Sequence, residues 1–248
     1  MRTGLCKVRL TVTGAPGPVV FFLPAHDEEA VIGTVLARMP ADVLGHPVVS
    51  VVIDDGSTDA TAYAAAEHGA KVESFGANRG LGAAVRRGLE LGGELGAVTV
   101  VFADADDEYD PAELERLVAP ILAGTADYVV GSRFAGGERR MRPHRELGNR
   151  VLTRAVRWAT GLPVTDGQSG YRALSADAAA AAEVIHDYNY AQVLTIDLVA
   201  KGFRYAEVPI SYRYRTTGRS FVRLGPYLRR VGPAFVRQVR LSHHTTSF

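Results

Sequence analysis

Acidic residues are concentrated in two short segments, and each directly follows a run of apolar residues. Asp-Ala-Asp-Asp-Glu-Tyr-Asp-Pro occupies 104–111, and Asp-Asp-Gly-Ser-Thr-Asp occupies 54–59. Carboxylates crowded so closely repel one another, so a cation or a basic side chain must neutralise them. An Asp-x-Asp spacing sets oxygen ligands on one side of an extended loop, which suits a Mg²⁺ or Mn²⁺ ion that also binds phosphate oxygens. The alternative is a solvated acidic loop that caps a helix, and the repetition after a second apolar run favours the metal site.

Two further segments carry weaker signals. Asn-Arg-Gly-Leu-Gly at 78–82 opens a predicted helix, where backbone amides either approach a phosphate or simply begin the helix. Pro-Ala-His-Asp-Glu-Glu at 24–29 is either part of the same site or an ordinary capped helix start. His26 is accordingly either a working base or a loop histidine.

The elements that must position these groups alternate between strands and helices. Apolar, β-branched runs predict buried strands at 19–23, 48–53, 97–102 and 126–131, and a weaker strand at 71–74. Helical spacing of apolar residues predicts helices at 28–38, 59–68, 81–91 and 111–122, the last with Asp110 as N-cap before Pro111. This alternation predicts an α/β fold, a mostly parallel central sheet with helices on both faces. Ligands bind beyond the carboxyl ends of such strands, where both acidic segments lie.

The pattern changes after about residue 135. In order along the chain we expect a mobile basic loop at 136–145, a helix at 147–160, a turn-rich segment at 165–172, an Ala-rich helix, a helix near 192–201 and a strand pair at 205–214. No repeat and no obvious linker interrupts the chain. We therefore expect one domain at 18–222, a flexible N-terminus at 1–17 and a basic amphipathic helical segment at 223–248.

Charge is distributed unevenly along the sequence. Residues 208–248 hold eight arginines and no acidic residue, whereas residues 1–207 hold 20 basic and 27 acidic residues. A basic end indicates an anionic partner, and helical spacing of its apolar residues favours an anionic membrane surface over plain packing on the domain. Nucleic acid is not expected, because the acidic segments would repel it and no nucleic-acid motif is present.

Cys6 is the only cysteine, and no signal peptide or membrane-spanning stretch is evident. The sequence therefore predicts a cytoplasmic protein without a transmembrane helix, at most peripheral on the cytoplasmic face of a membrane.

The acidic segments belong to a series of blocks that runs through most of the chain. The blocks are Pro-Ala-His-Asp-Glu-Glu at 24–29, Val-Ile-Asp-Asp-Gly-Ser-Thr-Asp at 52–59, Asn-Arg-Gly-Leu-Gly-Ala at 78–83, the segment at 104–111, Gly-Ser-Arg-Phe at 131–134, Asp-Gly-Gln-Ser-Gly-Tyr-Arg at 166–172, and Glu-Val-Pro-Ile at 207–210 followed by Arg-Thr-Thr-Gly-Arg-Ser at 215–220. Together they resemble family 2 glycosyltransferases of the GT-A (nucleotide-diphospho-sugar transferase) fold, in particular the dolichyl-phosphate mannose and glucose synthase branch. A single block is unspecific, but seven in this order are highly specific.

The resemblance implies roles for residues that match the family's motifs. It implies that nucleotide and substrate contact Pro24, Ala25, His26, Glu28, Asp54, Asp55, Asp104, Ala105, Asp106, Arg133, Arg145, Arg215 and Ser220. Asp104, Asp106, Arg133 and Arg215 are the implied catalytic residues, and Asp106 and Glu108 the implied ligands of Mg²⁺ or Mn²⁺. Arg133, helped by Arg145, would hold the acceptor phosphate, and Arg215 and Ser220 would close over the donor diphosphate.

Four positions depart from the family pattern. His26 replaces the usual Tyr, Asp27 the usual Asn and Glu108 the usual Gln, and Phe221 stands where many members have Lys. These differences bear on which nucleotide sugar is the donor, GDP-mannose or UDP-glucose, rather than on the fold.

The chemistry of the acceptor favours a polyprenyl or dolichyl phosphate. A phosphate monoester is largely ionised at neutral pH, so it needs cations to position it and no strong base. A hydroxyl acceptor needs a base, and Asp166 is the candidate outside the metal segment. The expected reaction is an inverting, metal-dependent hexosyl transfer. The alternatives are a glycosyltransferase acting on a hydroxyl of a small molecule, peptide or glycan, then a sugar-1-phosphate nucleotidyltransferase or a non-catalytic nucleotide-binding protein.

Overall fold

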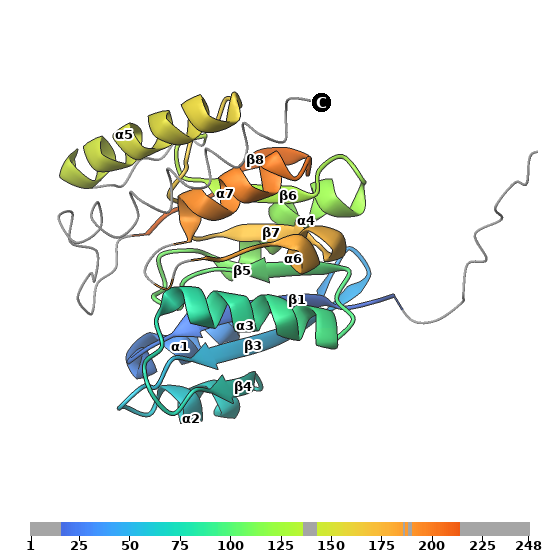
Figure 1. The fold of residues 1–248 in the computed structure, drawn as a ribbon. Helices are drawn as coiled ribbons and strands as arrows, with labels where there is room; N and C mark the ends of the chain where they lie inside the picture. Colours follow the sequence, from blue (N-terminus) through green and yellow to red (C-terminus); the bar gives the residue numbers. More distant parts are fainter. Residues whose placement is uncertain (1–15, 136–142, 186, 188–189, 214–248) are drawn as a thin grey trace, which may run out of the picture.

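The computed structural model describes residues 16–135, 143–185, 187 and 190–213. The strands of these residues form one sheet in the order β2-β3-β1-β5-β7-β6-β8, and β4 also pairs with β3 (Figure 1). The strands are β1 (Val19–Ala25), β2 (Asp42–Val43), β3 (His46–Asp54), β4 (Lys71–Ser74), β5 (Thr99–Phe102), β6 (Tyr128–Ser132), β7 (Arg172–Ser175) and β8 (Tyr205–Pro209). The pairs β1–β3, β1–β5, β3–β4 and β6–β8 are parallel, as the alternating pattern predicts.

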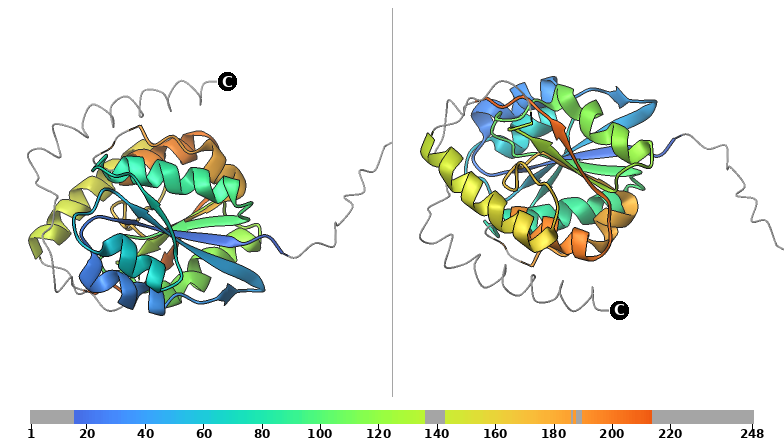
Figure 2. Two further views of the ribbon diagram at one scale, coloured as in Figure 1. Left: turned by 90° about the horizontal axis from the view of Figure 1, so that it is seen from below. Right: turned by 90° about the horizontal axis from the view of Figure 1, so that it is seen from above.

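Helices cover both faces of the sheet (Figure 2). They are α1 (Glu29–Ala37), α2 (Thr61–Glu67), α3 (Leu81–Glu94), α4 (Leu114–Leu122), α5 (Pro143–Thr160), α6 (Ala176–Ala181) and α7 (Ala191–Ala200), with a short 3₁₀ turn, η1 (Pro111–Glu113), ahead of α4. As expected, Asp110 caps this turn, because its side chain accepts the N–H of Ala112. Within the described part of the chain, no helix is both long and apolar enough to cross a bilayer.

Two apolar cores lie on opposite faces of the sheet because successive side chains of a strand point to opposite sides. Phe21 and Leu23 of β1 belong to the core that α1 and α4 cover. Phe22, between them, belongs to the core that α3, α6 and α7 cover, and its ring stacks on Phe102 with centroids 4.9 Å apart. The strand β1 is therefore buried on both sides, which explains its unbroken apolar sequence.

One prediction for the second half of the chain is wrong, and the sequence pattern misses one strand. The expected strand pair at 205–214 is a single strand, β8, over its described residues 205–213, and β8 pairs in parallel with β6. The turn-rich segment at 165–172 leads into β7, a strand that the sequence pattern does not reveal, and β7 lies antiparallel between β5 and β6. The helix expected at 147–160 begins earlier, at Pro143.

The antiparallel β7 matters for the position of the loops. Arg172, its first residue, pairs with Phe102 at the end of β5 and with Val130 in the middle of β6. The turn before β7 therefore lies at the same sheet edge as the carboxyl ends of β1, β3, β5 and β6. Segments that are far apart in the sequence meet at this edge.

Two glycines of α3 give a test of this packing. A Cβ at Gly88 would stand 2.4 Å from the ring of Phe22, whereas a Cβ at Gly93 would meet nothing within 4 Å. We expect Gly88→Ala to lower the free energy of unfolding by about 1–3 kcal/mol through overpacking. The control Gly93→Ala should raise it by about 0.5–1 kcal/mol, because alanine loses less backbone entropy in a helix. Urea denaturation measures both, and equal effects would contradict the packing of α3 on β1.

Candidate active site

The loops after β1 and β3 hold each other through side chains. Asp27, in a left-handed conformation with φ 54°, accepts the N–H of Thr58 at 2.8 Å, and its own N–H donates to Ser57 Oγ at 3.0 Å. The N–H of Glu28 donates to Thr61 Oγ1 at 2.8 Å. Pro24 and Ala25 are the last residues of β1, so the block 24–29 runs directly from the sheet into this paired loop.

Asp54, the last residue of β3, and Asp55, which follows it, are buried and bind neighbouring loops. Asp54 accepts the N–H of Ser57 and the hydroxyl of Ser74, each at 2.9 Å. Asp55 accepts the N–H groups of Arg79 and Gly80 at 2.6 and 2.9 Å. These amides therefore bind a carboxylate of the chain itself. Of the two interpretations of the segment 78–82, the structure favours the plain helix start over the phosphate cradle.

The acidic segment at 104–111 is neutralised in part by arginines. Asp107 forms an ion pair with Arg38, whose Nη1 also lies 3.9 Å from Asp110. Asp110 forms a second pair with Arg213, at 2.8 Å. Asp107 and Asp110 thus have the surface and helix-capping roles that their positions suggest, and the outer part of the segment does not need a metal ion.

Asp104 lies against the turn before β7. A Cβ at Gly170 would stand 2.5 Å from Asp104 Oδ2, so only glycine allows the carboxylate this position. The N–H of Gly170 donates to the buried hydroxyl of Tyr109 at 2.8 Å. Burial of Tyr109, together with nearby carboxylates, raises the pKa of that hydroxyl and keeps it neutral. The blocks at 104–111 and 166–172 therefore fit together as one unit.

The residues expected to bind a metal ion are Asp106 and Glu108. Asp106 Oδ1 accepts the N–H of Glu108 at 3.2 Å, and Glu108, 8% exposed, accepts the hydroxyl of Tyr212 at 2.8 Å. Across the described residues, no three His, Cys, Asp or Glu side chains converge into a ready-made cation site. The hard oxygen donors fit Mg²⁺ or Mn²⁺ all the same, because Mg²⁺ is commonly bound by one or two carboxylates together with the phosphates of its substrate.

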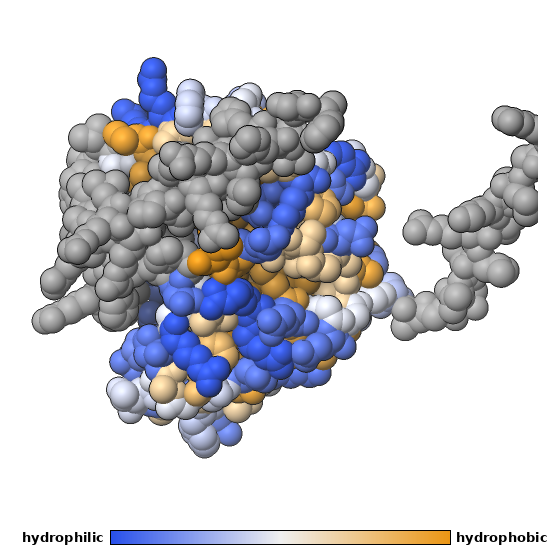
Figure 3. Space-filling view, in the orientation of Figure 1, coloured by the Kyte–Doolittle hydropathy of each residue, from blue (hydrophilic) through white to orange (hydrophobic). Residues whose placement is uncertain are grey.

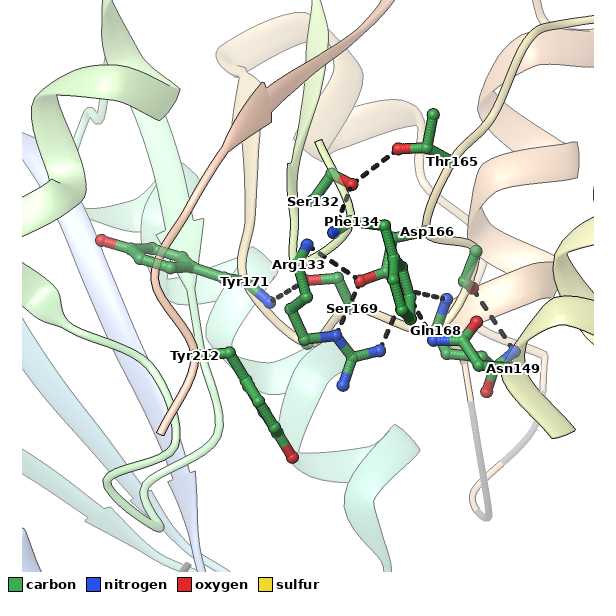
Figure 4. Close-up of polar contacts among 12 residues, drawn as sticks. Ser132, Arg133, Phe134, Asn149, Thr165, Asp166, Gln168, Ser169, Tyr171 and Tyr212 are labelled. Atoms are coloured by element: carbon green, nitrogen blue, oxygen red, sulfur yellow. Dashed lines mark hydrogen bonds and ion pairs between the residues drawn. The ribbon is translucent and has the colours of Figure 1, made fainter. Parts of the chain in front are cut away.

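Arg133, directly after β6, forms a buried ion pair with Asp166 of the turn before β7 (Figure 4). Its Nε and Nη2 donate to the two carboxylate oxygens at 2.6 and 2.9 Å, and its backbone N–H donates as well, at 3.2 Å. The side chains of Arg133 and Asp166 are 9% and 0% exposed. Burial alone would raise the pKa of Asp166, but the charge and hydrogen bonds of Arg133 outweigh it and hold that pKa below its usual value.

Three polar residues without an expected role complete this cluster. Asn149 of α5 donates to Asp166 Oδ1 at 3.0 Å, and Thr153, one helical turn later, donates to Asn149 Oδ1 at 2.9 Å. Glu207 of β8 accepts the backbone N–H groups of Thr165 and Asp166. The i, i+4 spacing of Asn149 and Thr153 places both on one face of α5, a signal that identifies them only once the helix is known to face the turn.

For three of the expected site residues, the structure does not describe the side chain. Arg215 and Ser220 lie outside the described residues. Arg145 belongs to α5, so it is part of a helix rather than of the basic loop, and its side chain is not described. Two other expected site residues are described. Ala105, between Asp104 and Asp106 in the sequence, is buried, and His26 Nε2 lies 3.7 Å from Asp27 Oδ2.

Comparison with known proteins gives matches that cover most of the chain. The profile of glycosyl transferase family 2 matches residues 20–180. The undecaprenyl-phosphate mannosyltransferase of Micrococcus luteus is 30% identical over 213 residues, 82% of this chain and 86% of the relative. The UDP-N-acetylglucosamine–dolichyl-phosphate N-acetylglucosaminyltransferase of Methanococcus voltae is 31% identical over 180 residues, 64% of this chain and 70% of the relative.

A solved structure is similar over nearly the whole chain. Glucosyl-3-phosphoglycerate synthase from Mycobacterium tuberculosis, in complex with Mn²⁺, UDP-glucose and phosphoglyceric acid, superposes with a TM-score of 0.69 and 27% identity. The match covers 91% of this chain and 81% of that one. The expected GT-A fold is thereby confirmed.

Among the described residues, the Arg133–Asp166 and Arg204–Asp127 pairs have similar geometry and different burial, so a comparison of the two isolates the effect of burial. Arg204 donates Nε and Nη2 to Asp127 at 2.8 and 2.7 Å, but this pair is 55% and 23% exposed. We expect Asp166→Asn to lower the free energy of unfolding by about 3–5 kcal/mol, because it leaves Arg133 buried without its counter-charge. The control Asp127→Asn should cost about 0–1 kcal/mol.

The same pair makes stability depend on pH. Because the folded pKa of Asp166 is depressed, its contribution is fully present above the unfolded value of about 3.9 and is lost as pH falls through the lower folded value. Denaturation of the unaltered protein at a series of acid pH values measures this loss. A stability that does not change below about pH 4 would contradict the buried pair.

Proposed function

The chain belongs to glycosyl transferase family 2, and from this premise we propose that it transfers a hexose from a nucleotide sugar to a polyprenyl or dolichyl phosphate. The donor in this proposal is of the GDP-mannose or UDP-glucose type. Transfer depends on a metal ion and inverts the anomeric configuration. Inversion follows because an acceptor oxygen attacks the anomeric carbon opposite the leaving nucleoside diphosphate. Relatives that carry the names of undecaprenyl-phosphate and dolichyl-phosphate sugar transferases support this acceptor class.

The observation that carries the proposal is that Asp166 forms a buried ion pair with Arg133 and has a lowered pKa. This residue is the carboxylate that the sequence offers as a base for a hydroxyl acceptor. Its two oxygens accept hydrogen bonds from Arg133 and Asn149, and its pKa is held below the usual value, so it is a weak base. A phosphate acceptor, already ionised, needs no such base.

Arg133 has the matching role on the acceptor side. Its bonds to Asp166 use only part of the donor set of a guanidinium, and they fix the orientation of the rest. Because its pKa lies well above the ordinary value, it stays charged at every physiological pH. In the proposal, Arg133 orients the acceptor phosphate, and Arg145 assists it.

The donor lies along the loops that follow β1, β3 and β5. The proposed nucleotide pocket is lined by Pro24, Ala25, His26, Glu28, Asp54 and Asp55, the last two acting through the loops that they hold. Asp104, Ala105 and Asp106 face the diphosphate, and Arg215 and Ser220 close over it. A bound Mg²⁺ or Mn²⁺ would supply charge neutralisation to the leaving diphosphate, with Asp106 and Glu108 as its protein ligands.

One alternative has support of its own. The similar solved structure is named a glucosyl-3-phosphoglycerate synthase and holds phosphoglyceric acid, so a small phosphorylated acceptor fits the same fold. An assay with both acceptor classes distinguishes the two. Incubation with radiolabelled GDP-mannose or UDP-glucose should transfer label to extracted polyprenyl phosphate, giving a lipid-soluble product. Label that appears only on phosphoglyceric acid would overturn the lipid acceptor.

Two neighbouring aspartates give a matched test of the metal segment. We expect Asp106→Asn to lower kcat/KM by at least about 100-fold, the size of effect seen when one group that stabilises the charge developing in a transition state is lost. Asp107→Asn is the control, since Asp107 pairs with Arg38 and its left-handed φ of 64° is one that asparagine tolerates. The control should stay within a few-fold of the unaltered protein. Equal losses would exclude a specific role for Asp106.

A substitution at Glu108 distinguishes a role in metal binding from a role in folding. Glu108→Gln keeps an oxygen to accept the Tyr212 hydroxyl but removes the negative charge. We expect the concentration of Mn²⁺ for half-maximal rate to rise about 10–100-fold, with the rate at saturating Mn²⁺ largely kept. Titration of activity with Mn²⁺ measures both quantities. An unchanged Mn²⁺ dependence would leave Glu108 with a structural role alone.

A further inference from the structure

The helix α5 carries exposed apolar side chains. Val151 and Trp158 are 62% and 71% exposed, which makes them two of the most exposed large apolar side chains among the described residues. A lone exposed apolar residue is common on protein surfaces, but these two lie seven positions apart, two turns along one face of the same helix.

Burial divides α5 into an inner and an outer face. Asn149, Thr153 and Val156 are buried and turn toward the segment before β7. Val151 and Trp158 lie opposite them on the helix, by the 3.6-residue period. The helix thus buries Asn149 and Thr153 beside Val156, whereas Val151 and Trp158 form an apolar strip on the outer face, which a helix that only packs on a domain lacks.

Arginines border the apolar strip. Arg150, Arg154 and Arg157 are exposed and lie along one side of it. Arg150 pairs with Glu146 at 2.7 Å, and Arg157 donates Nε to the carbonyl of Val164. Arg154 forms no ion pair with any described residue. Figure 3 shows strongly polar and apolar surface side by side where α5 lies in Figure 1.

We propose that the outer face of α5 is a docking surface for an anionic lipid membrane. A helix lies in the interface of a bilayer when its apolar side chains enter the headgroup region and its arginines meet anionic headgroups. Tryptophan is enriched at that depth, because its ring is apolar and its N–H finds a polar partner. Val151 and Trp158 supply the apolar part, and Arg150, Arg154 and Arg157 supply the charge.

Charge complementarity favours a membrane over a second copy of the chain. In a two-fold contact the same patch meets itself, so the arginine rows of two α5 helices would approach each other. Like charges in such a contact are unfavourable, whereas an anionic lipid surface attracts every one of them. An oligomer formed through α5 is therefore an outcome that the test must detect.

Docking through α5 would bring the proposed acceptor site to the membrane. The inner face of the same helix donates from Asn149 to Asp166, which pairs with Arg133. A helix with its side chains is about 10 Å across, so the inner face of α5 would lie roughly one helix diameter from the lipid surface, and Arg133 would lie beyond it, on the far side of Asp166. This consequence rests on the proposed function, because it gives the route of a lipid phosphate to Arg133, but membrane binding itself does not depend on turnover.

Co-sedimentation of the full chain with vesicles tests the surface. The probes are vesicles of phosphatidylglycerol mixed with phosphatidylcholine, and vesicles of phosphatidylcholine alone. We expect binding to the anionic vesicles, weakened by salt, and about tenfold weaker binding by the double variant Arg154→Gln/Trp158→Ser. The matched control is Tyr63→Ser on α2, which removes an aromatic side chain that is 69% exposed on a different helix.

The outcomes separate this proposal from the proposed function. Thermal denaturation confirms that both variants fold, and with a water-soluble phosphate acceptor both should keep the parental kcat/KM. Vesicle binding by the double variant equal to that of the parent would overturn the α5 surface, whatever the enzyme transfers. A parent that is dimeric by light scattering, with a monomeric double variant, would replace the membrane by a second copy. Vesicle binding lost as expected, with no sugar transfer to any acceptor, would overturn the function and leave the surface standing.

Discussion

The buried ion pair between Arg133 and Asp166 joins three parts of the chain. Arg133 follows β6, Asp166 belongs to the turn before β7, and Asn149 attaches α5 to the same carboxylate. A charge removed from water is tolerated only with a partner and further hydrogen bonds, and each member of this cluster supplies them to the next. The position of α5, and with it the relation of the site to the outer surface, depends on this pair.

The acidic residues at the sheet edge would repel one another, and different partners stabilise their charges. Asp54 and Asp55 accept backbone and serine hydrogens, and so hold the loops around the proposed nucleotide pocket. Asp107 and Asp110 pair with arginines. All four carboxylates thus hold parts of the protein together, and Asp106 is the residue proposed to act on the donor. Carboxylates that look alike in the sequence therefore differ in the partners that they bind.

Much of the fold could be predicted because its cause is local. An unbroken apolar, β-branched run such as β1 is compatible with few structures other than a buried strand. The helices of the fold are visible in the sequence as apolar residues at helical spacing. The strand β7 escaped prediction because Arg172, its first residue, is polar and yet fully buried, among Tyr128, Thr195 and the carbonyl of Ala191. Only neighbours brought in by the fold make that burial favourable.

The sequence by itself determined which residues are available for chemistry: the two acidic segments after strands, and the ordered blocks of a glycosyltransferase. It could do so because composition and spacing along the chain survive folding unchanged. The tertiary structure alone decided what each group is bonded to. Arg38 and Asp107 are 69 residues apart and Arg133 and Asp166 are 33 apart, so no local pattern records these pairs. Whether the carboxylate at 166 is a base or an anchor, and whether those at 104–111 meet an arginine or a ligand, follows from contacts through space.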